Sequence, residues 1–556
     1  MKTLLVGLDG FDPVLTEAWM KAGRLPVLSG LASAGRFSAL PSLIPPLSPS
    51  VWTSILTGVN PGRHGVFDFT VRKGHRVSLQ VGFDRRAPNI FEILSIAGRK
   101  VIAVGFPGSA VKAKVSGAVL AGWDSPFSVR AGRRGCWPER LHPALVKRFG
   151  KDYLTFDAIN QFSDPADVGE AVRSLKKTPY RRAALALSLC RERDLGPADL
   201  LAVYFPEADA AGHQFWHLHD PASPRRRVAA GNRFSGDPLE SVYASLDAAV
   251  GILVDGYGPD AVMVVSDHGM GGSGVKALSI NRALSDCGYL ALKGGRSGAM
   301  ADLAGRMALG AARLAPPGIR ELAAARVLKG LTDASLSMMR FGGMDWDRSL
   351  AFSEDLGYAP SIWLNGRAID GQRGQGAEPA VAGEIIEALM SHPGFSDKVT
   401  SVFRREQLYA GPYSRRIPDI LLDFALDGDY SYSMVPGLFR TMKSPVETLP
   451  EYCLSGEKGG SRHGSHRGSG IFIFASDAGA GAAEAGGSMS VYDLAPLILT
   501  LHGLGTGRYF DSERSCTGPE RIDVSAVRLD GPDRRMRSRE ADHVEGRRRL
   551  ELLGYL

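Results

Sequence analysis

Short, unbroken runs of apolar residues are the feature that most constrains the fold of this chain. Four such runs occupy residues 4–8, 101–106, 200–205 and 261–265, and polar or turn-forming residues follow each of them at once. Runs of this length are typical of strands that are buried on both faces of a parallel sheet. Helical patterns, such as the one at 238–254, separate the runs. The chain is therefore predicted to be an α/β protein, with a mostly parallel sheet and helices on both faces.

The composition indicates a folded protein and excludes few partners. With 556 residues, of which 44% are apolar, the chain can bury a large core as one α/β domain with insertions or as two domains. Its net charge of +7 permits attraction to anionic substrates, nucleic acid or lipid head groups without selecting among them.

The cysteines and the N-terminal segment bear on the cellular compartment. The five cysteines are widely spaced and odd in number, so neither a disulfide framework nor a cysteine-based zinc site is indicated. The first apolar run is too short for a signal peptide, and no run of about 18 apolar residues occurs. We expect a soluble, cytoplasmic protein.

Candidate metal ligands follow three of the predicted strands. Asp9 ends the first run, and Asp267 and His268 come directly after the fourth. Asp209 and His213 follow the third run and are four residues apart, so on a helix they share one face. Each signal also has a structural interpretation: a turn or cap for Asp9, a surface pair for Asp209 and His213, and a turn Asp beside a buried His for Asp267 and His268.

Other imidazoles lie near these candidates. His217 and His219 could compete as ligands, although we expect them to be solvated or structural. His466 stands in the Gly-rich segment 459–470, which is predicted to be a flexible loop before a strand at 471–474. Such a loop either is only mobile or brings imidazole and guanidinium groups to an anion.

A turn rich in hydroxyl groups precedes a helix in the segment 45–69. Ser48 lies between prolines, an apolar helical turn that contains Trp52 follows, and Gly58 ends it. A hydroxyl at a helix N-terminus lies beside main-chain N–H groups that favour a bound phosphoryl anion. The alternative is an ordinary helix cap.

Together these motifs, in this order, resemble the alkaline phosphatase superfamily, and more closely its type I phosphodiesterase and nucleotide pyrophosphatase branch. The resemblance covers about residues 2–504. It is carried by Gly-Leu-Asp9-Gly, the block Ser48-Pro-x-x-Trp-x-Ser-x-x-Thr-Gly-x-Asn-Pro-Gly-x-His-Gly, Asp209-x3-His213, Ser-Asp267-His268-Gly-Met and Gly-Ser-His466.

The resemblance implies a site for two divalent metal ions. It assigns one ion to Asp209, His213 and His466. The other ion would be held by Asp9, Asp267 and His268, with Ser48 bridging to it and attacking phosphorus. Carboxylate and imidazole ligands suit Zn²⁺ best, with Mn²⁺ as the alternative.

Two departures from the branch concern the nucleophile block. Its members usually carry Thr as nucleophile and Asn three residues later, where this chain has Ser48 and Val51. The residue that would contact the phosphoryl oxygen, in addition to the metal ions, is therefore not assigned. Sulfatases carry a Pro two residues after the nucleophile and then an Arg. This chain lacks that pattern, which argues against a sulfatase.

The predicted function is a metal-dependent phosphohydrolase that cleaves a phosphodiester or pyrophosphate bond through a phosphoserine intermediate. A phosphomonoesterase or a phosphomutase is the alternative among enzymes, and a non-catalytic protein that binds anionic surfaces is the alternative of another class. We expect a small phosphorylated substrate and no nucleic acid. Peripheral membrane contact is the less favoured alternative, and the oligomeric state is not predicted.

The predicted organisation is a catalytic domain at 1–510 and a charged tail at 511–556. A helical cap insertion is placed at about 275–360. Within it, the segment 299–331 is rich in Ala, Leu and Arg with helical spacing, so it is either a cap over a cleft or a basic surface helix pair. The cap is the favoured interpretation.

Overall fold

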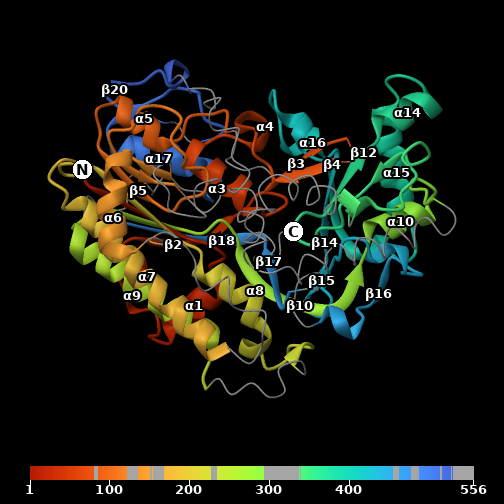
Figure 1. Cartoon of the computed structure of the whole chain (residues 1–556), viewed down its shortest axis with the longest axis horizontal. Helices are drawn as coiled ribbons and strands as arrows, with labels where there is room; N and C mark the ends of the chain where they lie inside the picture. Colours follow the sequence, from red (N-terminus) through yellow and green to blue (C-terminus); the bar gives the residue numbers. More distant parts are fainter. Residues whose placement is uncertain are drawn as a thin grey trace.

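An eight-stranded sheet lies at the centre of the larger of two lobes, the main lobe (Figure 1). The computed structural model describes residues 1–74, 76–79, 85–121, 135–150, 153, 168–226, 235–293, 337–338, 340–454, 462–477, 488–513, 516, 518–527 and 529. The strand order is β2 (Arg36–Pro41), β18 (Ser469–Ser476), β9 (Ala261–Val265), β1 (Thr3–Leu8), β8 (Leu200–Phe205), β5 (Val101–Val104), β6 (Gly117–Leu120) and β7 (Cys136–Trp137). The four predicted strands are the adjacent strands β9, β1, β8 and β5, and they pair in parallel.

Two strands run against the others. β18 is antiparallel to both of its neighbours, and β7 is antiparallel to β6. All other pairs within the sheet are parallel. The predicted fold class, an α/β protein with a mostly parallel sheet, is confirmed.

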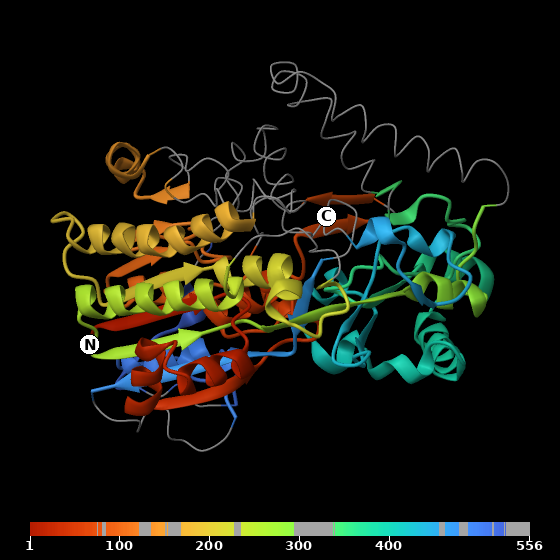
Figure 2. The same ribbon diagram turned by 90° about the horizontal axis from the view of Figure 1, so that it is seen from below.

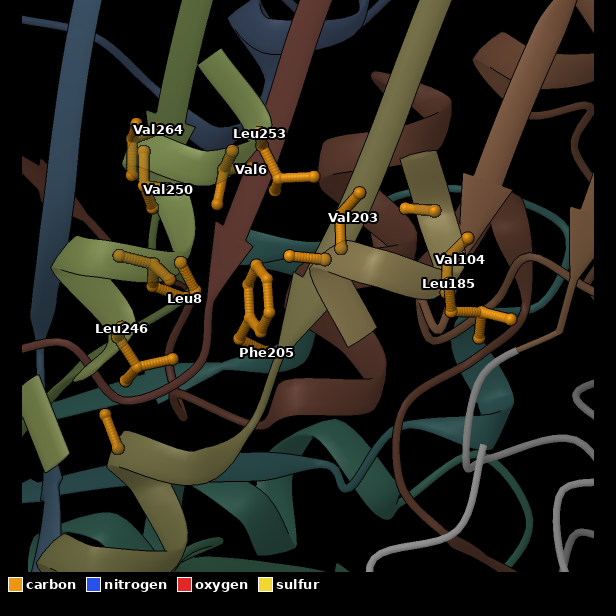
Figure 3. Close-up of a cluster of buried hydrophobic side chains, with 14 of the residues drawn as sticks. Val6, Leu8, Val104, Leu185, Val203, Phe205, Leu246, Val250, Leu253 and Val264 are labelled. Atoms are coloured by element: carbon orange, nitrogen blue, oxygen red, sulfur yellow. The ribbon is translucent and has the colours of Figure 1, made fainter. Parts of the chain in front are cut away.

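Helices cover both faces of this sheet. Alternate residues of β1 point to opposite faces, so Leu4 and Val6 enter one hydrophobic cluster and Leu5 enters the other. The first face carries α1 (Pro13–Lys21), α2 (Pro26–Ala34), α7 (Val168–Cys190), α8 (Glu207–His219) and α9 (Pro238–Tyr257). The second carries α3 (Ser48–Thr57), α5 (Ile90–Ile96) and α17 (Leu494–Leu501). Figure 3 shows the first cluster, where sheet residues such as Val6 and Val264 meet Val250 and Leu253 of α9.

The second lobe is built on smaller sheets. β10 (Gly269–Leu278) extends from the main lobe into it, as Figure 2 shows. The other strands are β11 (Ala351–Phe352), β12 (Ser361–Leu364), β13 (Val399–Arg404), β14 (Ile420–Phe424), β15 (Ser431–Ser433), β16 (Val446–Thr448) and β17 (Gly464–Arg467). Helices α10 (Ile280–Asp286), α14 (Gly366–Arg373), α15 (Glu378–Ser391) and α16 (Arg405–Leu408) pack on them.

The segment that follows β2 connects the two lobes. The hairpin of β3 (Thr70–Lys73) and β4 (Arg76–Leu79) places Val77 in the hydrophobic core of the second lobe. Before α3, the Tyr409 hydroxyl donates to the Ile44 carbonyl at 2.7 Å and accepts from the Ile44 N–H at 3.2 Å. The helix that begins at Ser48 is therefore held by both lobes.

The domain boundaries drawn from the sequence stay a prediction. Much of the predicted cap, including 299–331, lies outside the described residues. Asp511, where the tail was predicted to begin, accepts hydrogen bonds from Asn60 and Arg63, so the first tail residues that the structure describes pack on the main lobe. Among the described residues, no helix has the length and apolar character needed to cross a membrane.

Candidate metal centre

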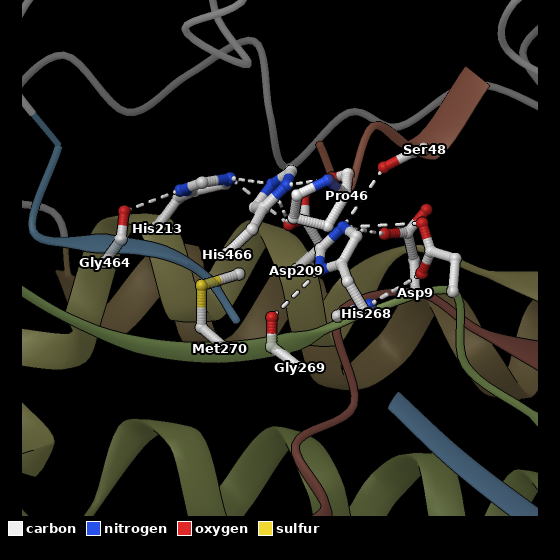
Figure 4. A network of polar contacts seen from close by, with 12 residues as sticks. Asp9, Pro46, Ser48, Asp209, His213, His268, Gly269, Met270, Gly464 and His466 are labelled. Atoms are coloured by element: carbon white, nitrogen blue, oxygen red, sulfur yellow. Dashed lines mark hydrogen bonds and ion pairs between the residues drawn. The ribbon is translucent and has the colours of Figure 1, made fainter. Parts of the chain in front are cut away.

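The polar residues predicted from the sequence meet at the carboxyl ends of β1, β8 and β9. Because these strands are parallel neighbours, Asp9, Asp209 and Asp267 reach the same edge of the sheet. Ser48 is the first residue of α3, and His466 lies on β17, a strand of the second lobe (Figure 4). The set is completed by His213 on α8 and His268 after β9, and all seven side chains are buried.

The predicted flexible loop around His466 is wrong for residues 464–467. They form β17, which pairs antiparallel with β10 and sets His466 opposite Met270. Gly269 begins β10. β10 and β17 are Gly-rich strands that lie almost 200 residues apart in the sequence, so the local pattern does not reveal their pairing.

Gly10 makes the close approach of β1 and α8 possible. Its φ is +66°, a left-handed conformation that favours glycine, and a Cβ there would lie 2.8 Å from Cα of Asp209. The Asp209 N–H donates to the Asp9 carbonyl at 3.0 Å across this contact. The turn thus fixes two of the candidate ligands relative to each other.

One group of possible metal ligands consists of Asp209, His213 and His466. Oδ1 of Asp209 lies 3.2 Å from Nε2 of His213 and 3.5 Å from Nε2 of His466. The two Nε2 atoms are 3.1 Å apart. This group has the membership predicted for the first ion.

The hydrogen bonds of the histidines determine which ring nitrogen faces the group. Nδ1 of His213 lies 2.8 Å from the Gly464 carbonyl, and Nδ1 of His466 lies 2.8 Å from the Pro46 carbonyl. Since a carbonyl only accepts, each Nδ1 carries a hydrogen, and each Nε2 is the nitrogen that faces the group. In a neutral ring this Nε2 is the atom that could bind a metal ion.

A second group consists of Asp9, Asp209 and His268. Nε2 of His268 lies 3.4 Å from Oδ1 of Asp9 and 3.2 Å from Oγ of Ser48. Oδ2 of Asp267 lies 3.4 Å from the same nitrogen. His268 Nδ1 also donates to a carbonyl, that of Gly269, at 2.9 Å.

The buried carboxylates of the site lack hydrogen-bond donors for some of their oxygens. Oδ1 of Asp9, Oδ1 of Asp209 and Oδ2 of Asp267 are buried and accept no hydrogen bond from the residues that the structure describes. Burial and the neighbouring carboxylates of Asp267 and Asp209 raise the pKa of Asp9 well above its usual range. Burial, with the charge of Asp209, raises the pKa of Asp267 to about 8. Burial lowers the pKa of His268 well below its usual value. Unpartnered carboxylate oxygens and neutral imidazoles are what divalent cations require, so the residues fit two metal ions.

Two aromatic residues to which the sequence analysis gave no role in the site contact Asp9. The Trp52 Nε1–H donates to Oδ2 of Asp9 at 3.0 Å, and the Tyr204 hydroxyl donates to the same oxygen. Tyr204 is the one residue with a polar atom in its side chain in the run 200–205, which was a signal that could have been used.

The remaining candidates lie elsewhere. The His217 ring stacks on His463 at 3.6 Å, and Nδ1 of His219 lies 2.5 Å from Oδ2 of Asp237. Neither belongs to a group of possible metal ligands among the described residues. Val51, at the position where the branch usually has Asn, is fully buried in the core against the sheet.

The family model for type I phosphodiesterase / nucleotide pyrophosphatase matches residues 3–435, which is more than three quarters of the chain. The chain belongs to this family, and the resemblance drawn from the sequence is confirmed. It is therefore an enzyme of the hydrolase class that acts on phosphoric ester or anhydride bonds. Enzymes of the family use divalent metals, which agrees with the two groups of buried ligands.

Solved structures with a similar arrangement share little sequence with this chain. Phosphonoacetate hydrolase from Sinorhizobium meliloti 1021, in complex with phosphonoformate, is 16% identical with a TM-score of 0.46, over 89% of this chain and 94% of that one. Murine ectonucleotide pyrophosphatase / phosphodiesterase 5 is 15% identical with a TM-score of 0.43, over 90% and 95%. A mutant of the alkaline phosphatase PafA is 12% identical with a TM-score of 0.43, over 90% and 95%. All three TM-scores are below 0.5, so the assignment rests on the family model. No curated protein matches the sequence.

Proposed function

We propose that the chain is a two-metal phosphohydrolase that cleaves a phosphodiester or pyrophosphate bond through a phosphoserine formed at Ser48. The observation that carries this proposal is the position of the Ser48 hydroxyl, buried and 3.2 Å from Nε2 of His268 within the second ligand group. A serine hydroxyl is a weak nucleophile unless a neighbouring base or a metal ion activates it.

The N-terminus of α3 supports binding of the phosphoryl group. Leu47, the residue before Ser48, has no side chain that could cap the helix. Main-chain N–H groups and the helix dipole therefore favour an anion beside the hydroxyl. This main-chain contact to the phosphoryl group would replace the contact that the usual Asn of the branch makes and that Val51 cannot make.

The reaction proceeds in two displacements. Oγ of Ser48 attacks phosphorus and forms an Oγ–P bond, while the bond from phosphorus to the leaving oxygen breaks and that oxygen keeps the electron pair. The hydroxyl proton passes to solvent or to the leaving group. Water then attacks the phosphoserine, which releases the second product and restores the Ser48 hydroxyl.

The metal ions would be held by the carboxylates and by the Nε2 atoms of the three histidines. When bound, they stabilise the charge that develops on the attacking and leaving oxygens. The Asp and His ligands favour Zn²⁺, with Mn²⁺ as the alternative. The Nδ1 hydrogen bonds to carbonyls hold the imidazoles in the orientation that this requires.

A hydrolysis screen tests the reaction class. The protein is supplied with Zn²⁺ or Mn²⁺ and offered p-nitrophenyl phosphate, its bis-ester, a sulfate ester and a dinucleotide. We expect the bis-ester or the dinucleotide to be the best substrate. Preference for the monoester would favour a phosphomonoesterase or phosphomutase, which share the metal core.

Substitution of Ser48 tests the mechanism. Ser48→Ala should keep both metals and lose at least about 10³-fold in rate, because the nucleophile is removed while positioning and charge stabilisation remain. Ser50→Ala is the matched control, since Ser50 is buried on the same helical turn and its hydroxyl has no partner among the described residues. Phosphoenzyme mapped to Ser50, or near-normal turnover by Ser48→Ala, would contradict the proposal.

The predicted alternative of binding without catalysis does not fit a chain that belongs to this hydrolase family. The segment 299–331, on which that alternative was based, lies outside the described residues. The cytoplasmic location stays a prediction from the sequence.

A further inference from the structure

One oxygen of the Asp9 carboxylate is held by two aromatic side chains. The Trp52 Nε1–H donates to Oδ2 at 3.0 Å, and the Tyr204 hydroxyl donates to the same atom. Oδ1 accepts no hydrogen bond from the described residues and lies 3.4 Å from Nε2 of His268. The two donors therefore leave one defined oxygen of Asp9 for the second ligand group.

Trp52 also connects Asp9 to the nucleophile. It lies four residues after Ser48 on α3, so the two side chains share one face of the helix. The indole hydrogen bond thus ties the helix that carries Ser48 to the end of β1. Tyr204 comes from β8 and lies opposite Gly7 of β1 in the parallel register.

The aromatic rings are fixed by close packing. A Cβ at Gly7 would lie 2.9 Å from Cη2 of Trp52 and 2.8 Å from Cε1 of Phe106, so only glycine leaves room for the indole on β1. The Trp52 ring meets Tyr204 at 5.3 Å and 90°, and Phe106 at 5.6 Å and 76°. Trp52, Tyr204 and Phe106 are fully buried. The close packing restricts the rotation of each ring. In the orientation observed, both donors point at Oδ2 of Asp9.

We propose that Trp52 and Tyr204 are positioning residues, which direct Oδ1 of Asp9 to a bound metal ion and set the place of Ser48 relative to that ion. The inference rests on the proposed function for its metal. Trp52 acts on Asp9 and lies on the helix of the proposed nucleophile, whereas Tyr204 acts on Asp9 from β8.

Substitution of the two donors separates these roles. Tyr204→Phe removes one hydroxyl, and Trp52→Phe removes the indole N–H, both in the full chain. We expect each variant to bind one of its two ions about 10- to 100-fold more weakly in a chelator competition, as is typical when a partner of a metal ligand is removed. The visible absorption of the Co²⁺-loaded protein should change in both variants. At saturating metal, only Trp52→Phe should lower kcat strongly, with little change in KM.

Phe91→Leu is the matched control. Phe91, on α5, is fully buried in the same hydrophobic cluster and its ring lies 6.1 Å from that of Phe106, so this variant should lower stability and keep metal affinity and the Co²⁺ spectrum. The inference is wrong if Tyr204→Phe and Trp52→Phe bind both ions as tightly as the unaltered chain, or if Phe91→Leu weakens metal binding as much as they do. If the unaltered chain binds no divalent metal, the proposed function fails as well, so the two failures are distinguishable.

Discussion

Histidines of this protein differ in which ring nitrogen carries the hydrogen. In His213, His268 and His466, Nδ1 donates to a main-chain carbonyl and Nε2 faces the candidate metal centre. In His64 the roles are reversed, because Nδ1 accepts from the Val66 N–H at 3.2 Å and Nε2 lies 2.9 Å from Oγ of Ser54. The three candidate ligand histidines thus differ from His64 in their hydrogen bonds.

His268→Ala should lower metal content and activity together and leave the fold largely intact. The variant removes an Nε2 that lies within 3.4 Å of Asp9 and Asp267. Elemental analysis and circular dichroism measure the two effects. His219→Ala is the control, since its ring contacts Asp237 away from both ligand groups, and it should keep full metal content. Full occupancy in His268→Ala would count against the assignment.

His64 should make stability fall in acid. Burial, with the charge of Arg85, lowers its pKa from 6.5 to about 3 in the folded state. Between these values the unfolded chain binds a proton that the folded chain does not, so stability is lost as the pH falls from about 6.5 toward 3. The loss from one such group is about 1.4 kcal/mol per pH unit. In urea unfolding at pH 7 and pH 5, His64→Asn should show a shallower pH dependence than the unaltered chain, and an equal slope would refute the assignment.

At the scale of elements, β17 is the strand on which the first ligand group depends. It pairs with β10 and places Gly464 against α8, where the His213 side chain donates to the Gly464 carbonyl. A Cβ at Gly464 would lie 2.3 Å from the Gly212 carbonyl oxygen. β17 and α8 therefore contact each other through main-chain atoms, which leaves no space for a side chain.

Gly464→Ala should displace β17 from α8 and weaken metal binding. The methyl group meets main-chain atoms of Gly212, which cannot rotate away as a side chain can. Gly468→Ala is the matched control two residues beyond His466, where an added Cβ meets nothing within 4 Å. Isothermal titration with Zn²⁺ compares the variants. Equal affinity in both would show that the contact does not control the ligand geometry.

The elements that the sequence predicted are those whose pattern is local. β1, β8 and β9 are runs of apolar residues, so the candidate ligands that follow them stand out at the strand ends, and the resemblance to the family assigned them to metal ions. β10 and β17 are rich in Gly and polar residues, and they form strands because they pair with partners that are remote in the sequence. β10 pairs with β15, β16 and β17, and β17 pairs with β10. Trp52 and Tyr204 were missed because each looks like an ordinary core residue until its contact with Asp9 is seen.

At the scale of the whole molecule, the site joins parts that are remote in the chain. His466 lies more than 450 residues after Asp9, and helix α3, which carries the proposed nucleophile, is held by the second lobe through Ile44 and Tyr409. Ions that bind only this assembled arrangement stabilise the folded state over the unfolded one.

Removal of metal should therefore lower the melting temperature of the whole protein. An ion at a free concentration 1,000 times its Kd contributes about 4 kcal/mol. Differential scanning calorimetry before and after EDTA, and again after Zn²⁺ or Mn²⁺ is restored, measures the effect. Ser48→Ala should keep it, whereas Asp209→Asn should lose most of it, because Asp209 belongs to both ligand groups. An unchanged melting temperature after complete metal removal would be incompatible with the proposed centre.

The place of β18 in the central sheet has a consequence for synthesis of the protein. This strand comes late in the described chain but lies between β2 and β9, and it is the neighbour through which β2 joins the sheet. A polypeptide that has been synthesised only as far as β16 carries Ser48 and most of the candidate ligands, but it lacks His466 and the strand that fixes β2 ahead of α3. On the proposed function, such an unfinished polypeptide cannot hydrolyse its substrate until β17 and β18 have been made.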